Sequence, residues 1–255
     1  MNNIFNRKII FQRDKRINFN NSLYKKIEHQ IYGELLDYFL IFNNSEQIKN
    51  ILLLNNKNNF LEKELFEYFL KKQNNIKNIQ FNNFNFVEND KSNFDYLHNS
   101  CKNNLIIGVN SFHNVNYLEK YLFCIKNNLE DGGIFCGNFF GNNNLSKLKK
   151  IIIKNDSIFS KNIYPRFNPT ISPESVYCVL QKTNFKNITL IPEKINYHFN
   201  SKNSFAEAMN FLKNTNERNY LIDAQKNIPN RRVFLENIPL QITLDFEVIR
   251  FYCHK

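Results

Sequence analysis

The stretch that decides the fold is Ile51-Leu52-Leu53-Leu54 followed by Asn55-Asn56-Lys57-Asn58-Asn59. Four consecutive apolar residues are typical of a short strand that is buried on both faces of a parallel sheet. In a nucleotide-binding fold the loop after such a strand carries glycines, because a residue without Cβ lets the backbone adopt φ > 0 and approach a cofactor. This loop has no glycine, although the chain has 6 of them. Its first βα turn is therefore unusual.

On both sides of this stretch, helical and strand patterns alternate. Apolar residues at helical spacing, or helix start signals such as Ser172-Pro173-Glu174, predict helices at residues 24–42, 60–72, 117–127, 145–153, 173–182 and 205–213. Short apolar or alternating runs predict strands at residues 51–54, 79–81, 84–87, 105–109, 133–140, 188–191, 196–199 and 243–252. This alternation indicates an α/β fold. We expect residues 1–45 to form an N-terminal basic segment and helix, and residues 46–255 to form the main domain with C-terminal cap elements.

The composition is that of a folded protein. The chain has 255 residues, 42% of them hydrophobic and 15% aromatic, which is enough for one large domain and too apolar for a disordered chain. Asn, Lys, Ile, Phe and Tyr are over-used and Trp is absent, a bias that an AT-rich genome explains. The net charge of +11 is carried by scattered lysines. The densest group is Lys147, Lys149, Lys150 and Lys154, which is typical of a solvated helix face. We therefore do not expect nucleic acid as a partner and keep it only as a minor alternative.

The cysteines and the hydropathy of the chain indicate the cellular compartment in which we expect the protein. The five cysteines (Cys101, Cys124, Cys136, Cys178 and Cys253) are odd in number, far apart and without paired metal-ligand spacing. We therefore expect free thiols, a reducing compartment and no metal site. No apolar run approaches the ~20 residues of a membrane-spanning helix. The expected location is the bacterial cytoplasm, with a peripheral position at the inner membrane as an alternative, or the mitochondrial matrix if the source is eukaryotic.

Five segments follow a common pattern in a fixed order. They are Phe5-Asn6-Arg7-Lys8; Leu105 to Leu118, with Ser111, His113, Val115 and Asn116; Ile134 to Leu145, with Phe135, Gly137, Phe140, Gly141 and Leu145; Met209 to Leu221, with Leu212, Glu217 and Asn219; and Phe246-Glu247-Val248-Ile249. In this order they resemble a class I S-adenosylmethionine-dependent methyltransferase. Within that superfamily the chain is most similar to the complex I assembly factor 5 group and the neighbouring malonyl carrier-protein methyltransferases of biotin synthesis.

The resemblance implies a fold, a cofactor and a set of site residues. The fold is Rossmann-like, with a central, mostly parallel sheet, helices on both faces and an antiparallel last strand. The implied cofactor is S-adenosylmethionine. By position in the family pattern, its binding residues are Asn55, Lys57 and Asn59 in place of the loop glycines, Asn82 in place of the acidic residue after the second strand, Asp95, Asn110 and Ser111. His113 is the implied catalytic residue, and Glu217 and Asn219 are implied contacts to a substrate or client.

Each of these assignments has a simpler alternative. His113 is either an acid, base or substrate contact, or a loop histidine held by local hydrogen bonds. Glu217 and Asn219 either contact a client or form a polar turn at the end of a helix. The loop from Asn55 to Asn59 is either a modified cofactor loop, since Asn tolerates the left-handed conformation, or a decayed one.

Three functions follow from the resemblance. In the first, the chain acts in assembly of respiratory complex I (NADH dehydrogenase) and modifies a client subunit by methyl transfer or arginine hydroxylation. In the second, it is a catalytically inactive methyltransferase fold that binds a client, which the loss of the loop glycines favours. In the third, it is a malonyl carrier-protein O-methyltransferase. The implied partner is a protein, a complex I subunit in the first case, and whether the chain is an enzyme stays open.

Overall fold

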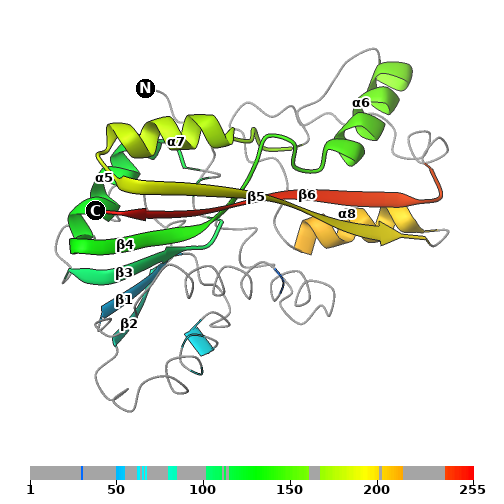
Figure 1. Ribbon diagram of the computed structural model, residues 1–255. Coiled ribbons are helices and arrows are strands. Elements are labelled where there is room, and N and C mark those ends of the chain that lie inside the picture. The colour runs from blue at the N-terminus through cyan, green and yellow to red at the C-terminus, as the bar shows by residue number, and fades with distance from the viewer. Residues whose placement is uncertain are drawn as a thin grey trace.

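The computed structural model gives a sheet-centred molecule (Figure 1). It describes residues 30, 50–54, 62–63, 65, 67, 80–84, 102–110, 112, 115–160, 167–200, 203–214 and 239–255.

The described residues form one six-stranded sheet. Its strands are β1 (Asn50–Leu54), β2 (Gln80–Phe84), β3 (Asn103–Gly108), β4 (Leu129–Phe140), β5 (Lys186–Phe199) and β6 (Ile242–His254). The strand order is β2-β1-β3-β4-β6-β5. Strand β1 pairs in parallel with β2 and β3, and β3 pairs in parallel with β4, whereas β6 runs antiparallel to both β4 and β5. The α/β fold class and the antiparallel last strand are therefore confirmed.

Helices cover both faces of the sheet, as expected. They are α5 (Leu118–Asn128), α6 (Ser146–Ser160), α7 (Pro173–Lys182) and α8 (Ser204–Asn214). Figure 1 shows α7 and α8 on opposite faces. Helices α5 and α7 pack in one apolar cluster with Leu52 and Leu54, while α6 and α8 contribute to a second cluster with Ile51 and Leu53. Because successive strand residues point to opposite faces, a strand covered on both sides must be apolar throughout.

The helix start at residue 172 has the predicted chemistry. The hydroxyl Oγ of Ser172 accepts a hydrogen bond from the backbone N–H of Ser175 at 3.2 Å, and Pro173 occupies the first helical turn. Hydrogen bonds from the Glu174 backbone and from Ser172 lower the pKa of the Glu174 carboxyl. This end of α7 is confirmed because its three signals are local and independent of tertiary contacts.

Two pairs of predicted strands are single strands in the structure. The runs expected at 79–81 and 84–87 are replaced by β2, which continues through Asn82-Asn83 and pairs with β1 along its whole length. Parallel pairing with β1 overrides the low strand propensity of Asn. The runs expected at 188–191 and 196–199 are joined through Pro192 in β5. Proline is tolerated there because β5 is the edge strand of this sheet, so one side of its backbone has no ladder to complete.

The N-terminal third of the chain is described only in part. Of the predicted helix 24–42, the structure describes Gln30, which is helical and accepts a hydrogen bond from Tyr197 Oη at 3.0 Å. Within the predicted helix 60–72, the described residues are helical and Leu65 is fully buried. The boundary expected near residue 45 falls outside the described residues. In the described part of the chain, no helix has the length and apolar character needed to cross a membrane.

Candidate functional site at the carboxyl edge of the parallel strands

The order in which the chain adds strands to the sheet changes direction at β1. From β1 it adds β2 on one side, and it then crosses to the other side of β1 to add β3. In open α/β sheets, ligands bind beyond the carboxyl ends of the strands at such a reversal. The two strand ends are joined here, because the backbone N–H of Val109 donates to the carbonyl of Leu54 at 3.0 Å. The edge formed by the ends of β1, β3 and β4 is therefore the candidate site.

A reciprocal pair of amides fixes the backbone at this edge. The backbone N–H of Asn110 donates to Asn138 Oδ1 at 3.2 Å, and Asn138 Nδ2 donates to Asn110 Oδ1 at 2.7 Å. Asn138 lies in β4 and is fully buried. Asn110 has φ of +45°, a left-handed conformation that Asn tolerates better than other residues with a Cβ. The pair holds a turn just after β3 that a glycine would otherwise provide.

Strands β3 and β4 approach each other closely beside this pair. Gly108 and Gly137 are paired in the ladder. A Cβ on Gly137 would lie 2.1 Å from the Gly108 carbonyl oxygen and 2.8 Å from Cζ of Phe251. The glycine at this position is therefore required by packing.

The loop after β4 is tied to β6 by two carboxylates. Glu247 accepts hydrogen bonds from the backbone N–H of Asn143 at 2.7 Å and from its Nδ2 at 3.0 Å. Asp245 accepts from Ser146 Oγ at 2.5 Å and from the N–H of Lys147 at 3.0 Å, so it caps the first turn of α6. These contacts hold the loop against the sheet.

The same loop contains a strained residue. Leu145 has φ of +55°, which is unfavourable for a residue with a γ-branched side chain. It is buried, and its N–H donates to the Asp245 carbonyl oxygen at 2.6 Å. Gly141, at the start of the loop, has no room for a Cβ, which would lie 2.3 Å from Glu247 Oε2. The loop is thus held in one conformation by its contacts with β6.

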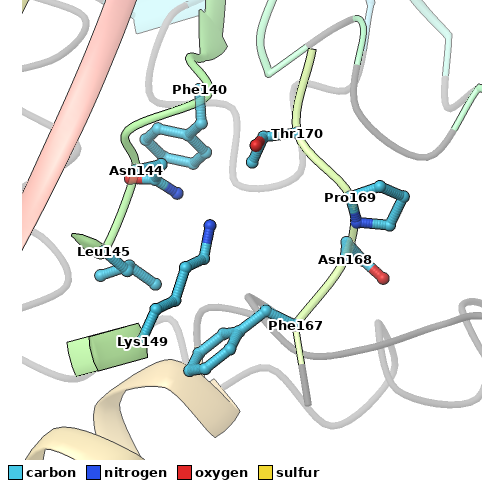
Figure 2. Close-up of a pocket in the computed structure, with 8 residues that line it drawn as sticks. All are labelled: Phe140, Asn144, Leu145, Lys149, Phe167, Asn168, Pro169 and Thr170. Carbon is cyan, nitrogen blue, oxygen red and sulfur yellow. The ribbon is translucent and has the colours of Figure 1, made fainter. Parts of the chain in front are cut away.

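This loop forms one wall of a pocket at the end of β4 (Figure 2). The pocket is a small hollow of about 20 Å³, room for about one water molecule, and it is open to solvent. Its wall continues through α6 to the segment before α7, and its lining residues are Phe140, Asn144, Leu145, Lys149, Phe167, Asn168, Pro169 and Thr170. The wall therefore combines apolar side chains with polar groups of both kinds, donors and acceptors.

The lysine-rich helix face is only partly as expected. Lys147, Lys150 and Lys154 are exposed, in agreement with a solvated face. Lys149 is half-buried and lines the pocket, with Nζ 5.9 Å from the centroid of the Phe167 ring. The expectation that all four lysines are solvated is wrong for Lys149, because the loop before α7 folds over its side chain.

Thiols behind the site are not arranged as nucleophiles. Burial raises the pKa of Cys136 in β4 to about 12. Burial also raises the pKa of Cys253 and of Cys124. All four described cysteines are free, as expected, and Cys178 is the exposed one among them. A thiol whose pKa is raised stays protonated near neutral pH and is a poor nucleophile.

This arrangement predicts the reactivity of each thiol. In a Cys101→Ser variant at about pH 8, an aromatic disulfide reagent should modify Cys178 rapidly and the three buried thiols only after denaturant is added. Counting the released chromophore with and without urea measures this. Rapid release from two or more thiols in the folded protein would contradict the burial of Cys124, Cys136 and Cys253.

The structure describes two of the site residues expected from the sequence, Asn110 and Asn82. Asn110 lies at the candidate edge. Asn82 lies inside β2, opposite Leu52 and two residues before the end of the strand, and not after it as expected. The others, Asn55, Lys57, Asn59, Asp95, Ser111, His113, Glu217 and Asn219, fall outside the described residues.

Sequence reasoning missed three residues of this region: Asn138, Asn144 and Lys149. For Asn138 a signal exists, because it is a polar residue inside the apolar run Ile134 to Phe140, and a buried amide needs a hydrogen-bonding partner. For the other two no local signal exists, since Asn and Lys are abundant throughout the chain.

Comparison with known proteins gives one curated relative. No protein-family model matches the chain. Over 132 residues the chain is 29% identical to a putative methyltransferase of Rickettsia prowazekii (strain Madrid E), and the match covers 52% of this chain and 56% of that protein. The chain thus spans about half the length of the curated relative that it matches.

Among solved structures, the chain is similar to methyltransferases at low sequence identity. One is a SAM-dependent methyltransferase of Archaeoglobus fulgidus, with a TM-score of 0.44, 12% identity, and coverage of 91% of this chain and 99% of that chain. Another is phosphoethanolamine N-methyltransferase 2 of Haemonchus contortus, with a TM-score of 0.46, 10% identity, and coverage of 88% and 52%. Over the 132 matched residues the chain is thus similar to a putative methyltransferase, and the described residues form an α/β sheet whose last strand is antiparallel.

Proposed function

We propose that the chain is a methyltransferase-like protein that binds S-adenosylmethionine and acts on a protein client, a subunit of respiratory complex I, during assembly of that enzyme. The observation that carries the first half of this proposal is the rigid edge at the reversal of the sheet, held by the Asn110–Asn138 amide pair. The curated relative supports the chemical class. The client follows from the sequence resemblance to the complex I assembly factor 5 group.

The described residues at this edge fit a nucleoside-type cofactor. Asn110 supplies a left-handed backbone turn, and its Nδ2 makes no hydrogen bond within the described part of the chain. Asn110 Nδ2 can therefore donate a hydrogen bond to a ribose hydroxyl or to a carboxylate of the cofactor. Asn55, Lys57, Asn59, Asp95 and Ser111 are the further residues that we propose to contact the cofactor.

The reaction that this fold would support is mainly one of positioning. S-adenosylmethionine, when bound, supplies a methyl group on a positively charged sulfur. The protein must hold the client nucleophile in line with that group and exclude water. We propose His113 as the acid or base that handles the nucleophile's proton, and Glu217 and Asn219 as contacts to the client. In a variant of this function the product is a hydroxylated arginine, which would also need dioxygen and an electron donor.

A second function is favoured by one specific observation. The loop that follows β1 has Asn55, Lys57 and Asn59 where a typical cofactor loop has glycines. A Cβ at those positions crowds a ligand, which favours a fold that binds its client without S-adenosylmethionine. In that case the Asn110–Asn138 pair stabilises only the sheet edge.

Isotope transfer to complex I subunits separates these functions. The purified chain is incubated with methyl-labelled S-adenosylmethionine and the isolated peripheral-arm subunits of complex I, and the subunits are analysed by mass spectrometry. Label on one subunit, lost in a His113→Ala variant, is the expected result. Stable association with a subunit, without label or added oxygen, would overturn the enzymatic proposal in favour of the binding module.

A further inference from the structure

Helix α6 has a basic outer side. Its exposed residues include Lys147, Lys150 and Lys154. The acidic residue of α6, Asp156, is fully buried, so no exposed carboxylate of this helix neutralises the three charges. With about 3.6 residues per turn, positions three and four apart are neighbours on a helix, so the three lysines form one stripe along its outer side.

Two large apolar side chains are exposed beside this stripe. Ile153 is 44% exposed and Ile158 is 58% exposed. Each is three or four residues from a lysine of the stripe, so the isoleucines and the lysines share one side of the helix. The inward side of α6 carries Leu148 and Ile152, which are buried in the core cluster. We define the α6 face by its exposed residues Lys147, Lys150, Ile153, Lys154 and Ile158.

The α6 face lies next to the candidate site. Only residues 141–145 separate the end of β4 from the start of α6, and Figure 1 shows α6 beyond that end of the strand. The first turn of α6 is fixed to β6, because Asp245 accepts hydrogen bonds from Ser146 Oγ and from the backbone N–H of Lys147. A protein bound to this face would therefore lie beside the carboxyl edge of the parallel strands.

We propose that the α6 face is the docking surface for the client, and that the client presents to it an acidic surface with an apolar centre. This inference rests on the proposed function, which supplies a protein as the partner. Protein interfaces combine an apolar core with a polar rim, and complementary charges give them specificity and fast association. The α6 face has both components, since its isoleucines can be covered by apolar side chains and its lysines can pair with carboxylates.

The α6 face is less suited to a nucleic acid or to a membrane. A nucleic acid would contact the lysines through its phosphates and would leave the two isoleucines without an apolar partner. A helix that lies on a membrane buries a continuous apolar face in the lipid. The main apolar face of α6 instead packs in the core of this chain. An acidic protein surface therefore fits the face better than either alternative.

Two triple substitutions with the same change in net charge test this inference. The first combines Lys147→Gln, Lys150→Gln and Lys154→Gln on α6. The control replaces three exposed lysines at the end of α7 and at the amino-terminal ends of β3 and β5, by Lys102→Gln, Lys182→Gln and Lys186→Gln. Binding of each full chain to the isolated peripheral-arm subunits of complex I is followed by surface plasmon resonance at low and high salt.

The α6 variant should bind about tenfold more weakly than the unaltered chain to the subunit that the unaltered chain binds. Three surface ion pairs of ordinary strength would give this loss, and most of the salt dependence should disappear with them. The control variant should bind as the unaltered chain does. A double variant, Ile153→Gln with Ile158→Gln, should dissociate about tenfold faster and keep its salt dependence. Circular dichroism and urea unfolding check that all variants are folded.

Other results would overturn the docking face in distinct ways. Unchanged binding in the α6 variant rejects the face and leaves the proposed function intact. Equal weakening in both triple variants reduces the effect to net charge and also rejects it. If no subunit binds the unaltered chain, the proposed client and the docking face fall together. Phosphatidylglycerol vesicles and a duplex oligonucleotide are tested in parallel, and binding to either that only the α6 variant loses, without any effect on the subunit, assigns the face to that ligand instead.

Discussion

Replacement of Gly137 by alanine is expected to lower the free energy of unfolding by at least about 3 kcal/mol, the upper range for overpacking of a core. The added Cβ would lie 2.1 Å from the Gly108 carbonyl oxygen. That oxygen belongs to the backbone of β3, so relief requires the β3–β4 ladder to separate at the candidate site. The measurement is urea unfolding followed by far-UV circular dichroism.

Gly132 offers a matched control for this substitution. A Cβ at Gly132 would meet nothing within 4 Å, although the backbone there has φ of +78°. Gly132→Ala should therefore lose only about 1–2 kcal/mol, from the left-handed conformation, and Gly132→Asn less. A loss below about 1 kcal/mol for Gly137→Ala would contradict the close approach of the two strands.

Replacement of Asn138 by leucine is expected to weaken both stability and cofactor binding. The side chains have similar volume, but leucine leaves the Asn110 backbone N–H without its acceptor and Asn110 Oδ1 without its donor. The expected loss of stability is about 1–3 kcal/mol, the cost of leaving partly buried polar groups unsatisfied. Because the Asn110 turn is then no longer fixed, affinity for S-adenosylmethionine should fall about tenfold or more. Calorimetric titration and urea unfolding measure the two effects.

A buried asparagine just before the start of β4, at the end of the sheet away from the candidate site, separates the loss of stability from the loss of cofactor affinity. Asn128 is 3% exposed, and its Nδ2 donates to the Cys124 carbonyl oxygen at 2.8 Å at the end of α5, just before β4 begins. Asn128→Leu should lose a similar amount of stability and keep its affinity. Equal affinity losses in Asn128→Leu and Asn138→Leu would mean that Asn138 acts only through general stability.

Local signals in the sequence predicted the elements that depend on them. The apolar run Ile51 to Leu54 predicts a strand covered on both faces, and Ser172 with Pro173 predicts a helix start; both are confirmed. The two split strands were wrong because sheet pairing decided their length. Asn82-Asn83 and Pro192 are turn residues by propensity, but β1 and β6 extend the strands across them.

The candidate site was less accessible to sequence reasoning than the fold. Asn110 could be named because it follows a clear strand in a recognisable segment. Asn138 is 28 residues away and meets it only through the parallel pairing of β3 and β4. The pocket residues Asn144 and Lys149 acquire their places from the anchoring of a loop by β6, which lies about a hundred residues further along the chain. Contacts at such separation leave no pattern in a single sequence.

Titration calorimetry of S-adenosylmethionine into the purified full chain tests the central claim most directly. The account predicts a single site with micromolar affinity, competition by S-adenosylhomocysteine, and no heat from ATP at the same concentration. A folded chain, shown by its cooperative unfolding, that gives no heat and no competition would contradict the claim that the carboxyl edge of β1 and β3 holds this cofactor.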